Sequence, residues 1–289
     1  MEGQKTMTDR YINIFTDFGF KKIFGEEVNK DLLIDFLNEL LKGEQSIKDL
    51  TYKKTEHLGS GDADRKAIFD LYCENEQGEK FIVELQKSKQ NFFKDRSVYY
   101  STFPIAEQGK RGIWNFELKA VYTIAILDFR FDDQDKDRTV VSNVQLMDTQ
   151  KMKVFYDKLT FVYLQMPNFT KTEDELETKF DCWLYVLRNL HKLHDRPKRI
   201  RDRIFEKFFE TAEISHFNPE EREEYEESLK YYRDLQNTLD TARDEGKIEK
   251  GFEVALNLIA MDFGDEQIGQ ATGLSINEVV KLRRKSNKQ

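Results

Sequence analysis

The amino-acid sequence predicts an α/β domain followed by a helical domain, and three features of the 289 residues support this. The apolar pattern before about residue 130 indicates a helix, three strands, a second helix and a further strand, in that order. A predicted β-hairpin within that order carries two acidic residues among apolar ones. Beyond about residue 165, leucines and aromatic residues recur at steps of three and four. We therefore expect one domain at residues 1–165 and a second at residues 166–289.

Each element of the first domain follows from a local pattern. Leucines and Phe36 recur at helical spacing, and a glycine follows them, which predicts a helix that ends near Gly43. A later helix is expected to begin after Asn91, whose side chain can cap it. The predicted helices span about Asn29 to Leu41 and Asn91 to Gly109, and the predicted strands span Ile47 to His57, Leu118 to Phe129 and, as one or two strands, Val154 to Leu164.

The predicted hairpin has a definite register. Its strands are Ile68 to Cys73 and Phe81 to Leu85, both rich in residues that favour β-structure. Asn75 and Glu79 can close a three-residue loop in which Gly78 takes the left-handed conformation. This loop makes the numbers of paired residues sum to 154, because Asn75 and Glu79 face each other.

The residue numbers of Asp70 and Glu84 also sum to 154, so these two residues should face each other with Cβ atoms about 5 Å apart. Two carboxylates among apolar neighbours repel each other unless a cation compensates them. Mg²⁺ prefers carboxylate oxygens and keeps open positions for phosphate oxygens. The alternative interpretation is a pair of half-exposed acids on an edge hairpin, which needs no metal.

The order of motifs resembles a known family. Asp70, thirteen intervening residues and Glu84-Leu85-Gln86 resemble the PD-(D/E)xK nuclease signature in a variant with Gln in place of Lys. The segments Asp17 to Gly25 and Arg96 to Tyr100 are similar to the family of recombination-promoting nucleases and transposases within that superfamily. The resemblance covers most of the chain and is clearest from Asp17 to Phe129.

This resemblance implies a restriction-endonuclease-like αβββαβ core and a metal-dependent DNA endonuclease that uses Mg²⁺ or Mn²⁺. It implies that Asp70 and Glu84 bind the metal, with the Leu85 carbonyl as a third ligand, and that Gln86 is catalytic. It also implies that Asp17 is a further candidate acid.

Four residues near the motif are candidates for substrate binding, namely Lys21, Arg96, Tyr99 and Tyr100. The tyrosines are equally well explained by packing. The competing class is a catalytically inactive protein of the nuclease fold that binds DNA or has a regulatory role. Loss of the motif lysine favours that class, and retention of both acids opposes it.

The second domain is predicted to consist of helices from Glu173 to Leu193, from Arg201 to Phe217 and from Pro219 to about Met261. Gly246 and Gly251 make a break in the long helix plausible. Its apolar stripe predicts a partner, and we expect a homodimer. The stripe consists of Leu229, Tyr232, Leu235, Leu239 and Ala242.

The last segment has the spacing of a helix-turn-helix, in which Ser275 and Glu278 form a capping box. A capped hairpin that closes a helical bundle is the alternative. If the final helix enters a DNA groove, its contacts are Asn277, Lys281, Arg283 and Arg284.

Composition limits the function classes. Hydrophobic residues make up 39% and charged residues 35% of the chain, and no run approaches the about 18 apolar residues of a membrane span. The polar start is no signal peptide, so we expect a cytoplasmic protein without membrane contact. The net charge of −8 argues against nonspecific coating of DNA. Double-stranded DNA remains the expected partner through local basic residues.

Overall fold

The structure is a computed structural model that describes residues 9–57, 67–109, 112–131 and 136–286. The chain forms two compact units, Met1–Leu229 and Lys230–Gln289. This division does not coincide with the expected boundary after residue 165. The reason is that two helices beyond that residue pack against the N-terminal helices.

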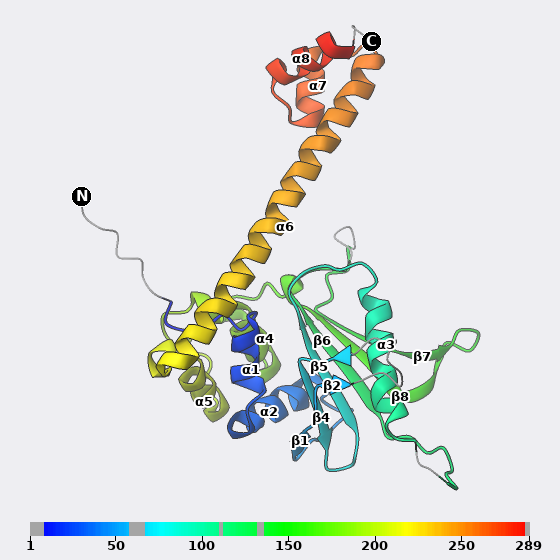
Figure 1. The fold of residues 1–289 in the computed structure, drawn as a ribbon, viewed down its shortest axis with the longest axis vertical. Helices are drawn as coiled ribbons and strands as arrows, with labels where there is room; N and C mark the ends of the chain where they lie inside the picture. Colours follow the sequence, from blue (N-terminus) through cyan, green and yellow to red (C-terminus); the bar gives the residue numbers. More distant parts are fainter. Residues whose placement is uncertain (1–8, 58–66, 110–111, 132–135, 287–289) are drawn as a thin grey trace. The chain divides into compact units, whose positions relative to one another are not determined.

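The first unit contains both helices and strands (Figure 1). The helices are α1 (Asp17–Phe24), α2 (Lys30–Leu40), α3 (Phe93–Ala106), α4 (Lys179–Asn189), α5 (Arg203–Ala212) and the beginning of α6 (Pro219–Ala260). The strands are β1 (Leu50–Tyr52), β2 (Glu56–His57), β3 (Ala67–Ile68), β4 (Leu71–Asn75), β5 (Lys80–Gln86), β6 (Val121–Leu127), β7 (Val141–Asp148) and β8 (Lys153–Gln165).

Six strands form a mixed sheet in the order β1-β4-β5-β6-β8-β7. Strands β1, β4 and β5 are antiparallel neighbours, whereas β5, β6 and β8 run parallel to one another. Strand β7 pairs antiparallel with β8. Strands β2 and β3 form a separate two-stranded ribbon. Strand β5 therefore stands where the sheet changes from antiparallel to parallel pairing.

The predicted hairpin register is confirmed. Leu71 pairs with Val83 and Tyr72 pairs with Ile82, so both pairs sum to 154. The Asn75 backbone N–H donates to the Glu79 backbone carbonyl at 3.0 Å, which closes the three-residue loop. Gly78 has φ +81°, the left-handed value that a side chain would disfavour.

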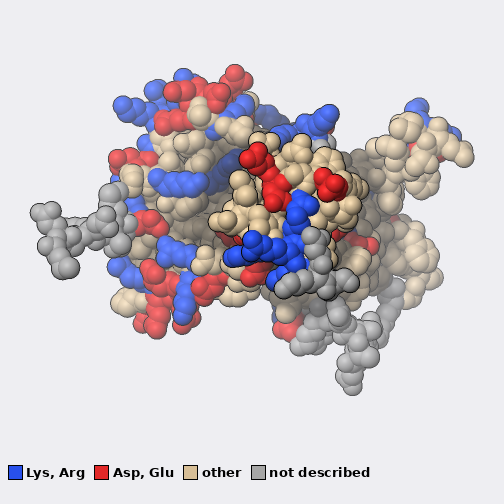
Figure 2. Space-filling model, turned by 90° about the horizontal axis from the view of Figure 1, so that it is seen from above, with Lys and Arg blue, Asp and Glu red and all other residues tan. Residues whose placement is uncertain are grey.

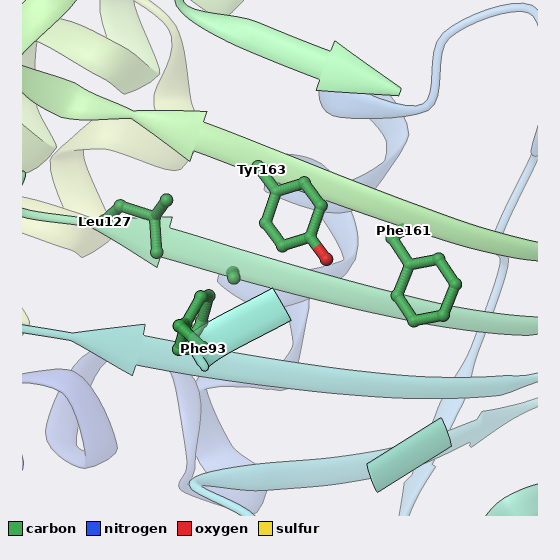
Figure 3. Packing of buried hydrophobic residues seen from close by; sticks show 5 residues of the cluster. Phe93, Leu127, Phe161 and Tyr163 are labelled. Atoms are coloured by element: carbon green, nitrogen blue, oxygen red, sulfur yellow. The ribbon is translucent and has the colours of Figure 1, made fainter. Parts of the chain in front are cut away.

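Helices cover both faces of the sheet, with α3 on one side and α1, α2, α4 and α5 on the other (Figure 1). Under α3, Phe93 packs toward Leu127 of β6 and Tyr163 of β8 (Figure 3). On the other side, the buried Trp183 ring of α4 lies 5.7 Å from the Phe36 ring of α2. These contacts explain why α4 belongs to the first unit.

Two predicted strands and one predicted cap differ from the structure. The strand expected from Ile68 to Cys73 is divided, because β3 ends at Ile68 and β4 begins at Leu71. The strand expected from Ile47 to His57 is likewise divided into β1 and β2. Asn91 does not cap α3: its N-cap is Phe92, which has φ +63° and makes no side-chain capping bond.

The second unit contains the rest of α6, followed by α7 (Asp265–Thr272) and α8 (Ile276–Ser286). Helix α6 is continuous through Gly246 and Gly251 over its 42 residues, so the predicted break is absent. The end of α6 packs against the two short helices through a buried cluster of Ala255, Ile259, Ile268 and Val279. In the part of the chain that the structure describes, no helix combines the length and apolarity that a membrane crossing requires.

Candidate active site

Asp70 and Glu84 meet at the point where β4 begins. The Asp70 backbone N–H donates to Glu84 Oε1 at 3.1 Å, and the Leu85 N–H donates to Asp70 Oδ2 at 2.7 Å. A residue in a strand points its N–H and C=O toward the same edge. The Leu85 carbonyl therefore faces the same side of β5 as the Asp70 carboxylate. The predicted proximity of the two acids is confirmed, and three oxygen donors are brought to one strand end.

Burial disfavours the ionised form of both acids. Glu84 is 8% exposed, and burial together with the neighbouring Asp70 charge raises its pKa to about 8. Burial also raises the pKa of Asp70, as does the charge of Asp17, while the Leu85 N–H and the charges of Lys21 and Lys87 oppose that rise. A buried carboxylate beside a partly buried one, both with raised pKa values, forms a site that a cation would stabilise.

Gln86, at the end of β5, is held by α3. Its side-chain carbonyl accepts a short hydrogen bond from the Arg96 guanidinium, and its side-chain amide donates to the Ser88 carbonyl at 2.9 Å. Arg96 also donates to Gln90 Oε1 at 2.7 Å. Both ends of the Gln86 amide are therefore engaged, and Arg96 supplies the positive charge nearest to them.

The two tyrosines of α3 have different environments. The Tyr100 ring lies edge-on to Phe69 at 5.2 Å and is half-buried, and burial raises the pKa of its hydroxyl. The Arg96 guanidinium lies 5.6 Å from the centre of the same ring. Tyr99 is exposed and contacts the Phe103 ring at 5.2 Å. Packing thus accounts for much of Tyr100, whereas Tyr99 is 43% exposed.

Lys87 is a candidate that the motif comparison missed. Its ammonium lies 2.7 Å from Asp17 Oδ1, which ties the end of β5 to the first turn of α1. A cavity of about 640 Å³ opens beside this pair and is lined by Asp17, Lys21 and Asp70. Lys87 follows Gln86 directly, so its place in the sequence was the available signal, but only the fold shows that it reaches Asp17.

The donor set fits a hard divalent cation with few protein ligands. No group of three or more His, Cys, Asp or Glu side chains with metal-binding geometry occurs within residues 9–57, 67–109, 112–131 and 136–286. Mg²⁺ is commonly bound by one or two carboxylates, with waters and phosphate oxygens in the remaining positions. Asp70, Glu84 and the Leu85 carbonyl would match that pattern.

The proposed DNA-contact residues of α8 are not equivalent. Asn277, Lys281 and Arg284 are exposed. Arg283 instead donates to Asp265 Oδ1 at 2.8 Å and to the Phe263 carbonyl. It ties α8 to the start of α7, so we remove it from the expected phosphate contacts.

Charge on the molecular surface is mixed. Figure 2 shows acidic and basic side chains interspersed on the face that it draws. Close to the candidate site, however, residues 87–96 contain four basic residues and one acid. Local positive charge thus accompanies the paired acids in a chain of net charge −8.

A mixed sheet flanked by helices, with two carboxylates brought together at neighbouring strand ends, is consistent with an α/β fold of the nuclease type. The chain belongs to the PD-(D/E)XK nuclease family transposases, because the model of that family matches residues 14–242. The match includes Asp17, Asp70, Glu84, Gln86 and Arg96, and it ends within α6. No curated protein and no solved structure shows significant similarity to the chain.

Proposed function

We propose that this nuclease-family protein is a metal-dependent endonuclease that hydrolyses phosphodiester bonds of double-stranded DNA. The observation that carries the proposal is the contact of the partly buried Asp70 with the buried Glu84 and with the Leu85 backbone at the end of β5. Mg²⁺ or Mn²⁺ is the expected cofactor. When bound, such an ion polarises the phosphate and lowers the pKa of an attacking water.

The residues of the chain divide the remaining work. Asp70, Glu84 and the Leu85 carbonyl would hold the ion. Gln86 and Arg96 would orient the scissile phosphate, Gln86 through its amide and Arg96 through its fixed charge. Lys87 holds Asp17 beside the cavity next to Asp70, where Lys21 can meet an adjacent phosphate.

Several finer assignments belong to the same proposal. We infer that α2, β1, β4, β5, α3 and β6 form the αβββαβ core. We further propose that the helical part of residues 166–289 assists DNA binding through Asn277, Lys281 and Arg284 of α8. A homodimer would place two such sites on one duplex, and the cytoplasm is the expected location.

A second candidate function is DNA binding or regulation without catalysis. The specific observation in its favour is Gln86, which stands where the superfamily signature has lysine and which cannot carry a positive charge. Retention of both acids in contact opposes it, since loss of catalysis removes the need to keep two carboxylates together in a largely apolar environment.

Nicking of supercoiled plasmid separates the two candidates. The parent protein should nick in Mg²⁺ or Mn²⁺ and not in EDTA, and Asp70→Ala or Glu84→Ala should abolish nicking. Glu76→Ala is the matched control, because Glu76 lies in the turn of the same hairpin and its carboxylate accepts hydrogen bonds from the backbone N–H groups of Lys48 and Asp49. It should cleave like the parent. DNA binding without nicking by the parent would establish the second candidate instead.

A further inference from the structure

The segment between Gln86 and Arg96 contains an aromatic residue that the signature does not use. Phe92 is 79% exposed and has φ +63°. A left-handed backbone costs a non-glycine residue free energy, and such strain gathers at functional sites. Exposure of a large apolar ring removes the usual compensation by burial. Packing therefore does not account for this residue at this position.

Phe92 is connected to the candidate site through Arg96. The Arg96 backbone N–H donates to the Phe92 carbonyl at 2.9 Å, and the Arg96 guanidinium bonds to the side chains of Gln86 and Gln90. The conformation of Phe92 thus sets the start of α3 and the position of the arginine. Phe92 precedes Arg96, whose guanidinium contacts Gln86, by one helical turn.

The surroundings of Phe92 combine aromatic and basic character. Lys89 and Lys94 are exposed on either side of it in the sequence, and Tyr99 exposes its ring further along α3. Positive side chains that follow a phosphate backbone, with aromatic rings between them, are the features of surfaces that bind unpaired nucleotides. Apolar side chains can also enter between base steps and unstack them.

We propose that Phe92 stacks on a DNA base next to the phosphate that a cation at Asp70 and Glu84 would bind, and that it prefers a base that is unpaired or easily unpaired. The proposal rests on the proposed function and adds a contact that selects the local structure of the DNA. The left-handed backbone sets the direction in which the Cα–Cβ bond of Phe92 leaves the chain before DNA arrives, which lowers the entropy lost on binding.

Phe116 provides a matched control. It is 78% exposed and has φ +61°, nearly the same values as Phe92. It lies in the segment that leads into β6, whose first residue Val121 pairs with the first residue of β5. The candidate site is at the other end of β5. Replacement of either phenylalanine by asparagine, which tolerates the left-handed conformation, keeps the backbone geometry.

The experiment measures binding of a fluorescent DNA hairpin with a single-stranded arm to the full-length protein in Ca²⁺, a cation that carboxylate and carbonyl oxygens bind, over a range of salt concentrations. Phe92→Asn should weaken binding about 5- to 150-fold, whereas Phe92→Tyr should retain it. The salt dependence should not change, because no charge is removed. The affinity lost on replacing Phe92 by asparagine should be smaller for a fully paired duplex of the same length. Phe116→Asn should bind like the parent, and the melting temperature of both asparagine variants should stay equal or rise.

Three outcomes overturn the proposal for Phe92 alone. One is equal binding by Phe92→Asn and the parent, and another is equal loss in Phe116→Asn. A third is a fall in melting temperature of Phe92→Asn that accounts for its weaker binding. Plasmid nicking by the same proteins distinguishes the two proposals. If the parent nicks and Phe92→Asn binds normally, the endonuclease activity is supported and the role of Phe92 is not. A parent that binds no DNA overturns both.

Discussion

Glu84 couples the candidate site to the stability of the fold. Because its pKa in the folded protein is raised to about 8, the folded state holds a proton that the unfolded chain releases near its ordinary pKa of 4.5. In EDTA, the free energy of unfolding should therefore fall as pH rises between these two values and level off above about 8. Thermal unfolding from pH 4 to 9 in EDTA measures this.

The variant Glu84→Gln should remove most of that fall, since glutamine keeps an oxygen for the Asp70 N–H but does not ionise. Asp70→Asn should likewise raise the melting temperature above pH 8 by removing the repulsion. Glu76→Gln, in the turn of the same hairpin, should leave the pH dependence unchanged. A parent and a Glu84→Gln variant with parallel pH profiles would contradict the assigned burial of this charge.

Gln86 is expected to act through its amide and through Arg96. Gln86→Ala should lower the nicking rate about 10- to 10³-fold, less than loss of either acid, by analogy with removal of one transition-state donor. Gln86→Lys places a second cation against the Arg96 guanidinium and should lower the melting temperature. Arg96→Gln in the same chain should restore it, and a double-mutant cycle measures the coupling. Nicking by Gln86→Ala at the parental rate would assign Gln86 a structural role.

The sequence predicts which residues of one hairpin face each other better than it predicts contacts between residues of different elements. The pairing of Leu71 with Val83, the residues next to Asp70 and Glu84, follows from loop length and the two-residue period of strands, both of which are local. The bond between Arg96 and Gln86 and the ion pair between Lys87 and Asp17 depend on how α3 and α1 pack on the sheet. No local pattern determines that packing, so these contacts could not be derived from spacing.

Among the elements, the hairpin of α7 and α8 offers the clearest test of DNA contact. Lys281→Gln together with Arg284→Gln should weaken DNA binding and reduce the slope of log affinity against log salt by about 1.8, since about 0.9 counterions are released per neutralised phosphate. Titration of binding with salt measures the slope.

Lys247→Gln together with Lys250→Gln removes the same charge from α6, where the two lysines pair with Asp244 and Glu253. This control should leave the slope unchanged. If both double variants change the slope equally, the effect is one of net charge. If neither changes it, the hairpin has only a structural role.

Elements with strong periodicity were predicted well and irregular ones were not. Helix α2 and strand β6 lie where their apolar patterns place them. The pattern from Ile68 to Cys73 hides a bend, because Phe69 and Asp70 leave the strand while their neighbours remain β-like. The pairing of β7 with β8 also escaped prediction. Strand β7 is largely exposed, so it lacks the apolar alternation that marks a half-buried strand.

For the whole molecule, the apolar stripe on α6 still predicts a homodimer, but Leu229 no longer belongs to the expected interface. Leu229 is 6% exposed within the first unit, so it is already covered and cannot serve a partner. Leu239 and Ala242 are exposed. Light scattering at micromolar concentration should give twice the 34.4 kDa of one chain. Leu239→Asp should restore the mass of one chain, and a monomeric parent with and without DNA would contradict the prediction.

The continuity of α6 has a consequence for local stability. This helix begins in one compact unit and ends in the other, yet residues 237–250 are exposed on every side. Only backbone hydrogen bonds and short-range ion pairs such as Lys247 with Asp244 hold that stretch helical. Its amide protons should therefore exchange with solvent faster than those near Tyr225 or Ile259, which are buried. A protease that cleaves after Arg243 or Lys247 would then find its site in a transiently unwound helix and leave two folded fragments.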